Sequence, residues 1–136
     1  MNYKKIIFGM FAFFLSSFVI QGILASVIAG EYFESISIFR NPPILVMAMA
    51  QTALSGAAVA VLYSFTNFEG TPVLKGVKFG FLIGIIIVPF IAMDLPARFD
   101  IPSIGTWISI QGALGIFHCI VAGILISLIY GKDKKS

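Results

Sequence analysis

The stretch from Ile104 to Tyr130, IGTWISIQGALGIFHCIVAGILISLIY, decides the fold of this chain. An α-helix rises roughly 1.5 Å per residue, so about 20 residues cross a hydrocarbon core of ~30 Å, and this stretch is longer than that. No charged side chain lies between Asp100 and Lys132. We therefore expect a membrane-spanning helix here, with the other apolar stretches packed around it.

Polar side chains interrupt this stretch on one face of the expected helix. At about 100° per residue, Trp107, Gln111 and His118 fall within a narrow arc, so they are expected to point at another helix or a cavity rather than at lipid. Cys119 is expected roughly 100° away from His118 around the helix. The shared face is the clearest functional signal in the sequence.

The composition of the whole chain predicts an integral membrane protein. Of its 136 residues, 59% are hydrophobic and 11% are charged, whereas soluble domains carry about 25% charged residues. Spans at about 6–29, 44–65, 73–93 and 104–130 consume most of the length, so residues 1–136 form one transmembrane domain. The expected fold is all-α, an antiparallel bundle of four transmembrane helices.

The first span also has features of a signal peptide. Val27 and Ala29 suit the −3 and −1 positions of a cleavage site before Gly30. The apolar run from Ile6 to Ala29 is, however, longer than the roughly 7–15 residues of a signal-peptide core. The length favours an uncleaved span, and cleavage stays open as the alternative.

The basic residues are distributed unequally between the two sides of the expected bundle. Only Arg40 and Arg98 fall beside the outer ends of the spans. The other seven of the nine basic residues fall on the opposite side: Lys4, Lys5, Lys75, Lys78, Lys132, Lys134 and Lys135. This bias predicts that both termini face the cytoplasm. The layout is similar in hydropathy and glycine placement to small four-helix proteins of bacterial inner membranes, where we expect this multi-pass chain to reside.

Glycines recur at every fourth position in the third span, and in the fourth span Cys119 lies midway between two glycines that are eight positions apart. These glycines are Gly76, Gly80, Gly84, Gly115 and Gly123. Small residues at this spacing let neighbouring helix backbones approach closely. We expect these glycines to pack helices rather than to bind a ligand.

Glutamines from three spans are expected at a similar depth. Counting roughly 1.5 Å per residue places Gln21, Gln51 and Gln111 about 10 Å below the outer surface, with His118 two turns deeper. The sequence favours side chains that hydrogen-bond neighbouring helices. The alternative is a polar pocket, with Trp107 in its roof beside the charges of the second outer loop, which are Asp94, Arg98 and Asp100.

The sequence indicates no catalytic, cofactor-binding or metal-binding residues. No carboxylate is expected at the depth of His118, and Cys119 points away from it, so neither a catalytic dyad nor a metal ligand set is formed. An enzyme is therefore the less favoured class. Nucleic acid is also excluded as a partner, because the lysines cluster at the ends of apolar runs.

The favoured function is that of a small accessory or structural subunit of the inner or plasma membrane. Its expected partners are membrane lipids and either further copies of the chain, as a homo-oligomer, or a larger membrane complex, because the small-residue ridges offer many close-packing faces. The alternative is an oligomeric transporter or channel for a small solute, with a path lined by Gln21, Gln51, Gln111 and His118.

The expected orientation can be tested by labelling single cysteines in a Cys119→Ser background. A Phe99→Cys variant should react with an impermeant thiol reagent added from outside, and a Lys134→Cys variant should not, because the positive-inside bias places the C-terminus in the cytoplasm. Labelling of the Lys134→Cys variant in intact cells would mean that the C-terminus faces outward, which contradicts the predicted topology.

Overall fold

The computed structural model describes residues 2–40 and 42–131, and the described chain is built from helices. Lys132, Lys134 and Lys135, which entered the expected topology, lie outside these ranges. Four helical segments are long and apolar enough to cross a membrane: Tyr3–Glu34, Leu45–Ser64, Pro72–Arg98 and Ile104–Tyr130. The chain is therefore an all-α four-helix membrane bundle.

Two of the four segments contain a π-helical stretch. The first comprises α1 (Tyr3–Ser17), η1 (Phe18–Leu24) and α2 (Ala25–Glu34). The third comprises α4 (Pro72–Pro89), η2 (Phe90–Asp94) and α5 (Leu95–Arg98). The second and fourth segments are the single α-helices α3 (Leu45–Ser64) and α6 (Ile104–Tyr130).

The first and third segments extend beyond the ends expected from hydropathy. The first continues past Ala29, where the backbone kinks, to Glu34. The third continues past Met93 through η2 and α5 to Arg98, with Pro96 in the first turn of α5. Part of each expected outer loop is therefore helical.

Helices α4 and α6 make the most extensive contact in the bundle, and their backbones touch. A Cβ added at Gly80 would collide with the backbone carbonyl of Cys119, and one at Gly76 would collide with the Cα of Ile124. Gly123 faces the backbones of both Gly76 and Gly80. Gly84 and Gly115 lie on the same interface, where an added Cβ would meet Ile116 and Val88, respectively, at 2.8 Å. The five glycines therefore all lie where α4 meets α6.

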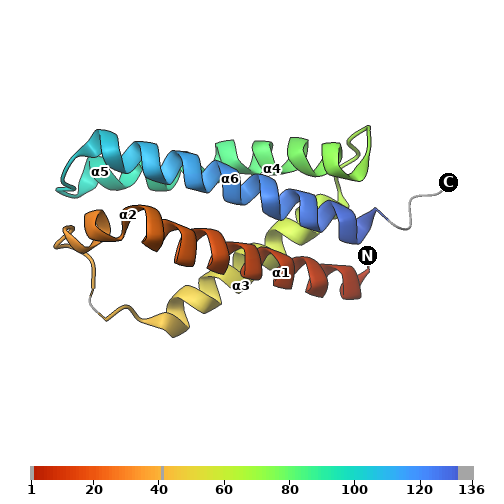
Figure 1. Cartoon of the computed structure of the whole chain (residues 1–136). Helices are drawn as coiled ribbons and strands as arrows, with labels where there is room; N and C mark the ends of the chain where they lie inside the picture. The colour runs from red at the N-terminus through yellow and green to blue at the C-terminus, as the bar shows by residue number, and fades with distance from the viewer. Residues whose placement is uncertain (1, 41, 132–136) are drawn as a thin grey trace.

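Helix α1 packs against both α6 and α3 (Figure 1). A Cβ at Gly9 would meet Ala60 of α3 at 2.8 Å, and one at Gly56 would meet the carbonyl of Met10 at 3.0 Å. This close contact is confined to the inner part of α3, which runs obliquely to α1 and diverges from it toward its N-terminal end. Every residue from 42 to 51 is exposed, so the N-terminal half of α3 stands away from the bundle.

At the end of the bundle where Tyr3 and Tyr130 lie, which we call the inner end after its expected orientation, polar side chains form hydrogen bonds between helices. The Ser127 hydroxyl donates to the carbonyl of Pro72 at 2.6 Å, so the Tyr63 hydroxyl, 2.6 Å from Ser127, is the donor in that second bond. The Tyr130 hydroxyl donates to the carbonyl of Ala60 at 3.0 Å. These bonds link α3, α4 and α6 across the buried core.

Alanine substitutions at two glycines test the backbone contact. Gly80→Ala should destabilise the bundle by roughly 1–3 kcal/mol, because the methyl group meets the α6 backbone, which cannot rotate away. Gly112→Ala is the matched control: no atom lies within 4 Å of its added Cβ, and alanine favours helix by about 1 kcal/mol. Thermal unfolding in mild detergent measures both. Equal melting temperatures for the two variants would mean that the close backbone contact at Gly80 does not stabilise the bundle.

Candidate functional site: a polar cavity between the four helices

A cavity of about 290 Å³ lies between all four spanning segments. It is in the half of the bundle nearer the loops at residues 35–44 and 99–103, which we call the outer half after its expected orientation. Its polar lining combines amide, hydroxyl, imidazole and thiol groups: Ser17, Gln21, Gln51, Thr52, Ser55, Gln111, His118 and Cys119. Its apolar lining includes Phe13, Ile87, Val88 and Ile91.

The structure brings together the three glutamines and the histidine that the sequence singled out. Gln21 reaches the cavity from η1, Gln51 from α3, and Gln111 and His118 from α6. The side chain of Gln51 donates to the Ser55 hydroxyl at 3.0 Å, one turn further along its own helix. Within the described chain, the side chains of Gln21 and Gln111 make no hydrogen bond. None of the three amides therefore bonds another helix.

His118 is a buried polar residue on the cavity wall. It is 6% exposed, and its Nε2 has no hydrogen-bond partner among the described residues. The Phe13 ring packs edge-on against the imidazole at 4.8 Å, and the Phe13 carbonyl is its hydrogen-bond partner. Because Nε2 is unpartnered, that bond is made through Nδ1–H, and the neutral ring presents Nε2 as an acceptor.

The cavity carries no formal charge on its lining residues. Its hydrogen-bonding capacity comes from amide N–H donors, amide carbonyls, hydroxyls and the imidazole. In the part of the chain that the structure describes, no group of three His, Cys, Asp or Glu side chains could hold a metal ion. The site can therefore bind a molecule by neutral hydrogen bonds and apolar contact.

Trp107 does not line the cavity, although the sequence placed it on the same arc as Gln111 and His118. It is 2% exposed, in an outer cluster with Ile36 and Ile101. Its indole N–H donates to the carbonyl of Ile91 at 3.1 Å. That carbonyl lies in the π-helical stretch η2, in which a carbonyl bonds the N–H five residues later. For Ile91 the residue five positions later is Pro96, which has no N–H. Trp107 thus satisfies a carbonyl that the π-helical turn leaves open.

The charges of the second outer loop are likewise absent from the cavity lining. Arg98 Nε lies 3.0 Å from Asp94 Oδ2, one turn apart on the helical end of the third segment. The two side chains are 69% and 38% exposed, so the pair contributes at most about 1 kcal/mol. Asp100 is exposed as well. These residues form a surface feature separate from the cavity.

Several lining residues were not singled out from the sequence. Ser17 and Ser55 each lie four positions from a lining glutamine, and this i, i+4 spacing is the signal that could have found them. Thr52 neighbours Gln51 and also reaches the cavity. Cys119 was expected to point away from His118, but the cavity extends around α6 toward α4, so both residues line it.

Both π-helical stretches border the cavity. Gln21 lies within η1, and Ile91 lies within η2. A π-helical turn widens the helix and leaves carbonyls outside the α-helical pattern, and such turns are frequent at functional sites. The two irregular stretches therefore lie at the level of the polar cavity.

Comparisons with models of protein families, with curated proteins and with solved structures give no match. The fold and the cavity therefore define the class on their own. The chain is a small membrane protein whose four apolar helices enclose an uncharged polar cavity in one half of the bundle.

Proposed function

We propose that this protein binds a small, uncharged, hydrogen-bonding molecule in the polar cavity. The observation that carries the proposal is the imidazole of His118, which lines a cavity shared with Gln21 and Gln111 and whose buried Nε2 has no hydrogen-bond partner among the described residues. A polar group kept from water without a hydrogen bond costs roughly 1–3 kcal/mol. A bound molecule that donates to Nε2 would remove this cost.

The contrast between the two halves of the bundle supports a binding role. In the inner half, the hydroxyls of Tyr63, Ser127 and Tyr130 all bond groups of other helices. These are the interhelical contacts that stabilise a membrane bundle. In the outer half, the amides of Gln21 and Gln111 bond no other helix among the described residues, and the Nε2 of His118 has no partner although the Phe13 carbonyl bonds the same ring. Polar residues that served only to join helices would be expected to resemble the inner set.

Binding is supported better than free conduction through this chain. The cavity is bounded below by the buried core, in which Tyr63, Phe79 and Ile126 pack between the helices. The backbone contact between α4 and α6 continues through the same level. Transport of a solute along the cavity would need these contacts to open, so we place the chain among membrane proteins that bind, present or carry a ligand.

The proposed setting is the bacterial inner membrane, with both termini in the cytoplasm. Lys5 and Lys75 support this orientation, since both lie at the end of the bundle opposite the cavity, beside Tyr130 and Pro72. The cavity then opens in the half of the bilayer nearer the outer surface. Lipids are the proposed immediate partners, and nucleic acid is not among them.

A second candidate function is that of an accessory subunit, and α3 is the observation that favours it. This helix packs mainly against α1, and apolar side chains such as Val46, Leu54 and Leu62 are exposed along it. A second copy of the chain could cover this face. Purification in mild detergent with mass determination tests whether a second copy covers α3. A stable homo-oligomer supports the accessory-subunit role, and a monomer contradicts it.

Leucine substitutions in the cavity test the binding proposal. Gln111→Leu should leave the ligand-free protein at least as stable as the wild type, because the Gln111 amide makes no hydrogen bond within the described chain. His118→Leu removes the unpaired Nε2 together with the bond to the Phe13 carbonyl, so it should cost no more than about 1 kcal/mol. Both variants should lose a small molecule that copurifies with the wild type. Native mass spectrometry, with fragmentation of the released species, measures the loss. Ser109→Leu is the control, because Ser109 lies on the same helix, bonds the Gly105 carbonyl and does not line the cavity.

Two results would contradict the proposal. Destabilisation of both cavity variants by more than about 2 kcal/mol would mean that these side chains join helices. Retention of the same bound molecule by wild type and both cavity variants would place the ligand elsewhere on the protein.

A further inference from the structure

We infer that the molecule held in the cavity is the head of a single-chain neutral lipid with free hydroxyl groups, of the monoacylglycerol class, whose chain lies in a groove between α1 and α3. This inference rests on the proposed function and specifies its ligand. It follows from the shape of the space beside the cavity and from the chemistry of the cavity wall.

The polar cavity continues sideways into an apolar groove. Ser17, Gln21 and Thr52 line the cavity and also line a space of about 480 Å³ between the first segment and α3. The other lining residues of that space are apolar: Phe14, Phe18, Gly22, Leu45, Ala48 and Met49. A molecule with its polar head in the cavity can therefore extend its remaining length between the two helices.

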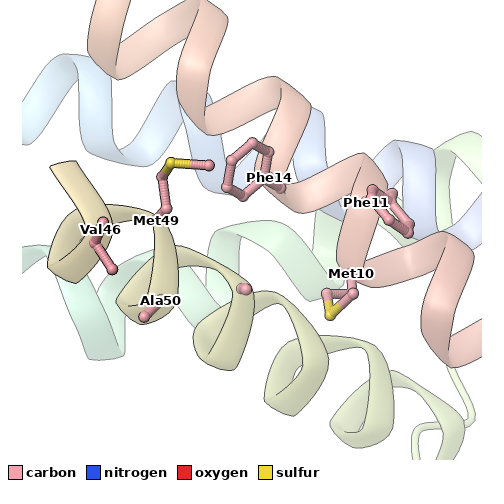
Figure 2. A pocket seen from close by; sticks show the side chains of 7 residues that line it. Met10, Phe11, Phe14, Val46, Met49 and Ala50 are labelled. Atoms are coloured by element: carbon pink, nitrogen blue, oxygen red, sulfur yellow. The ribbon is translucent and has the colours of Figure 1, made fainter.

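The groove continues further along the same pair of helices. Phe14 and Met49 line a second apolar space of about 540 Å³ as well as the first one. Figure 2 shows Met10, Phe11 and Phe14 of α1 on one side of this second space. Val46, Met49 and Ala50 of α3 lie on its other side. The two spaces adjoin at Phe14 and Met49, and we call them together the α1–α3 groove.

The divergence of α3 explains both the groove and its access. The outer half of α3 stands away from the bundle, and small residues on facing surfaces, Gly22 and Ala48, leave the space between the helices unfilled. Because α3 lies at the side of the bundle with its N-terminal half exposed, the groove opens sideways, where a membrane-spanning bundle meets the hydrocarbon layer. A lipid can then enter sideways without leaving the membrane.

The chemistry of the cavity wall selects an uncharged, hydroxyl-bearing head. The neutral imidazole offers Nε2 as an acceptor, and the side-chain amides of Gln21 and Gln111 offer N–H donors. A hydroxyl group both donates and accepts, so it can satisfy both kinds of group. A phosphate head would lie where no lining residue carries a positive charge, and its desolvation would go uncompensated.

The geometry also favours one chain rather than two. The two apolar spaces lie between the same two helices and adjoin at Phe14 and Met49, so one chain that passes these side chains can occupy both. The glycerol head of a monoacylglycerol brings two hydroxyls and an ester carbonyl to the cavity. These groups match the several donors and acceptors on its wall.

The test is a native mass spectrometry titration of the delipidated full chain with 1-monooleoylglycerol. Ala48→Phe should weaken binding at least about tenfold, because the new ring occupies the groove, and tenfold corresponds to ~1.4 kcal/mol. Ala58→Phe is the matched control: it makes the same change at an exposed position of α3 outside the groove, so it should leave binding within about twofold. Gln111→Leu should weaken binding without altering the groove. Circular dichroism and melting temperature establish that each variant is folded.

The outcomes separate this inference from the proposed function. If Gln111→Leu weakens binding and Ala48→Phe does not, the cavity binds a ligand but the chain does not lie in the groove. If neither variant changes binding, both the lipid assignment and the proposed site are wrong. Equal or tighter binding of 1-oleoyl-lysophosphatidylglycerol would overturn the uncharged head, and tighter binding of a prenylated quinol would overturn the glycerol head.

Discussion

The backbone contact between α4 and α6 is the constraint on which the rest of the structure depends. Gly76, Gly80 and Gly123 bring two helix backbones together, and no side chain larger than hydrogen fits at these points. In a membrane, where apolar burial gives little advantage over lipid contact, such close packing is a main source of helix association. Helices α4 and α6 form the most extensively packed pair of the bundle, and α1 packs against α6 and α3.

The polar groups in the two halves of the bundle are arranged differently. At the inner end, the bonds from Tyr63 to Ser127 and from Ser127 to Pro72 join three helices. At the outer end, α3 leaves α1, and the space that results is lined by amides and by the unpaired Nε2 of His118. The packed half holds the helices together, and we propose that the polar groups of the open half are available for a ligand.

Hydropathy was sufficient to predict four helices, since each apolar run must satisfy its own backbone in lipid. Helical spacing placed Gln111 and His118 together, but it could not place Trp107. The indole is drawn to the Ile91 carbonyl, which is open because of a π-helical turn and a proline on another segment. The divergence of α3 could not be predicted either, because it depends on how the helices pack against one another in the folded bundle. For the same reason the apolar groove has no signature in the sequence.

The central claim is that the cavity amides face a space rather than one another. Side-chain amide NMR of the full chain in lipid nanodiscs tests it most directly, with glutamine side chains labelled with ¹⁵N and assigned by substitution. The account predicts nuclear Overhauser contacts from the Gln21 and Gln111 side-chain NH₂ groups to water or to a bound lipid head. Contacts that instead join Gln21, Gln51 and Gln111 directly across the helices would contradict it.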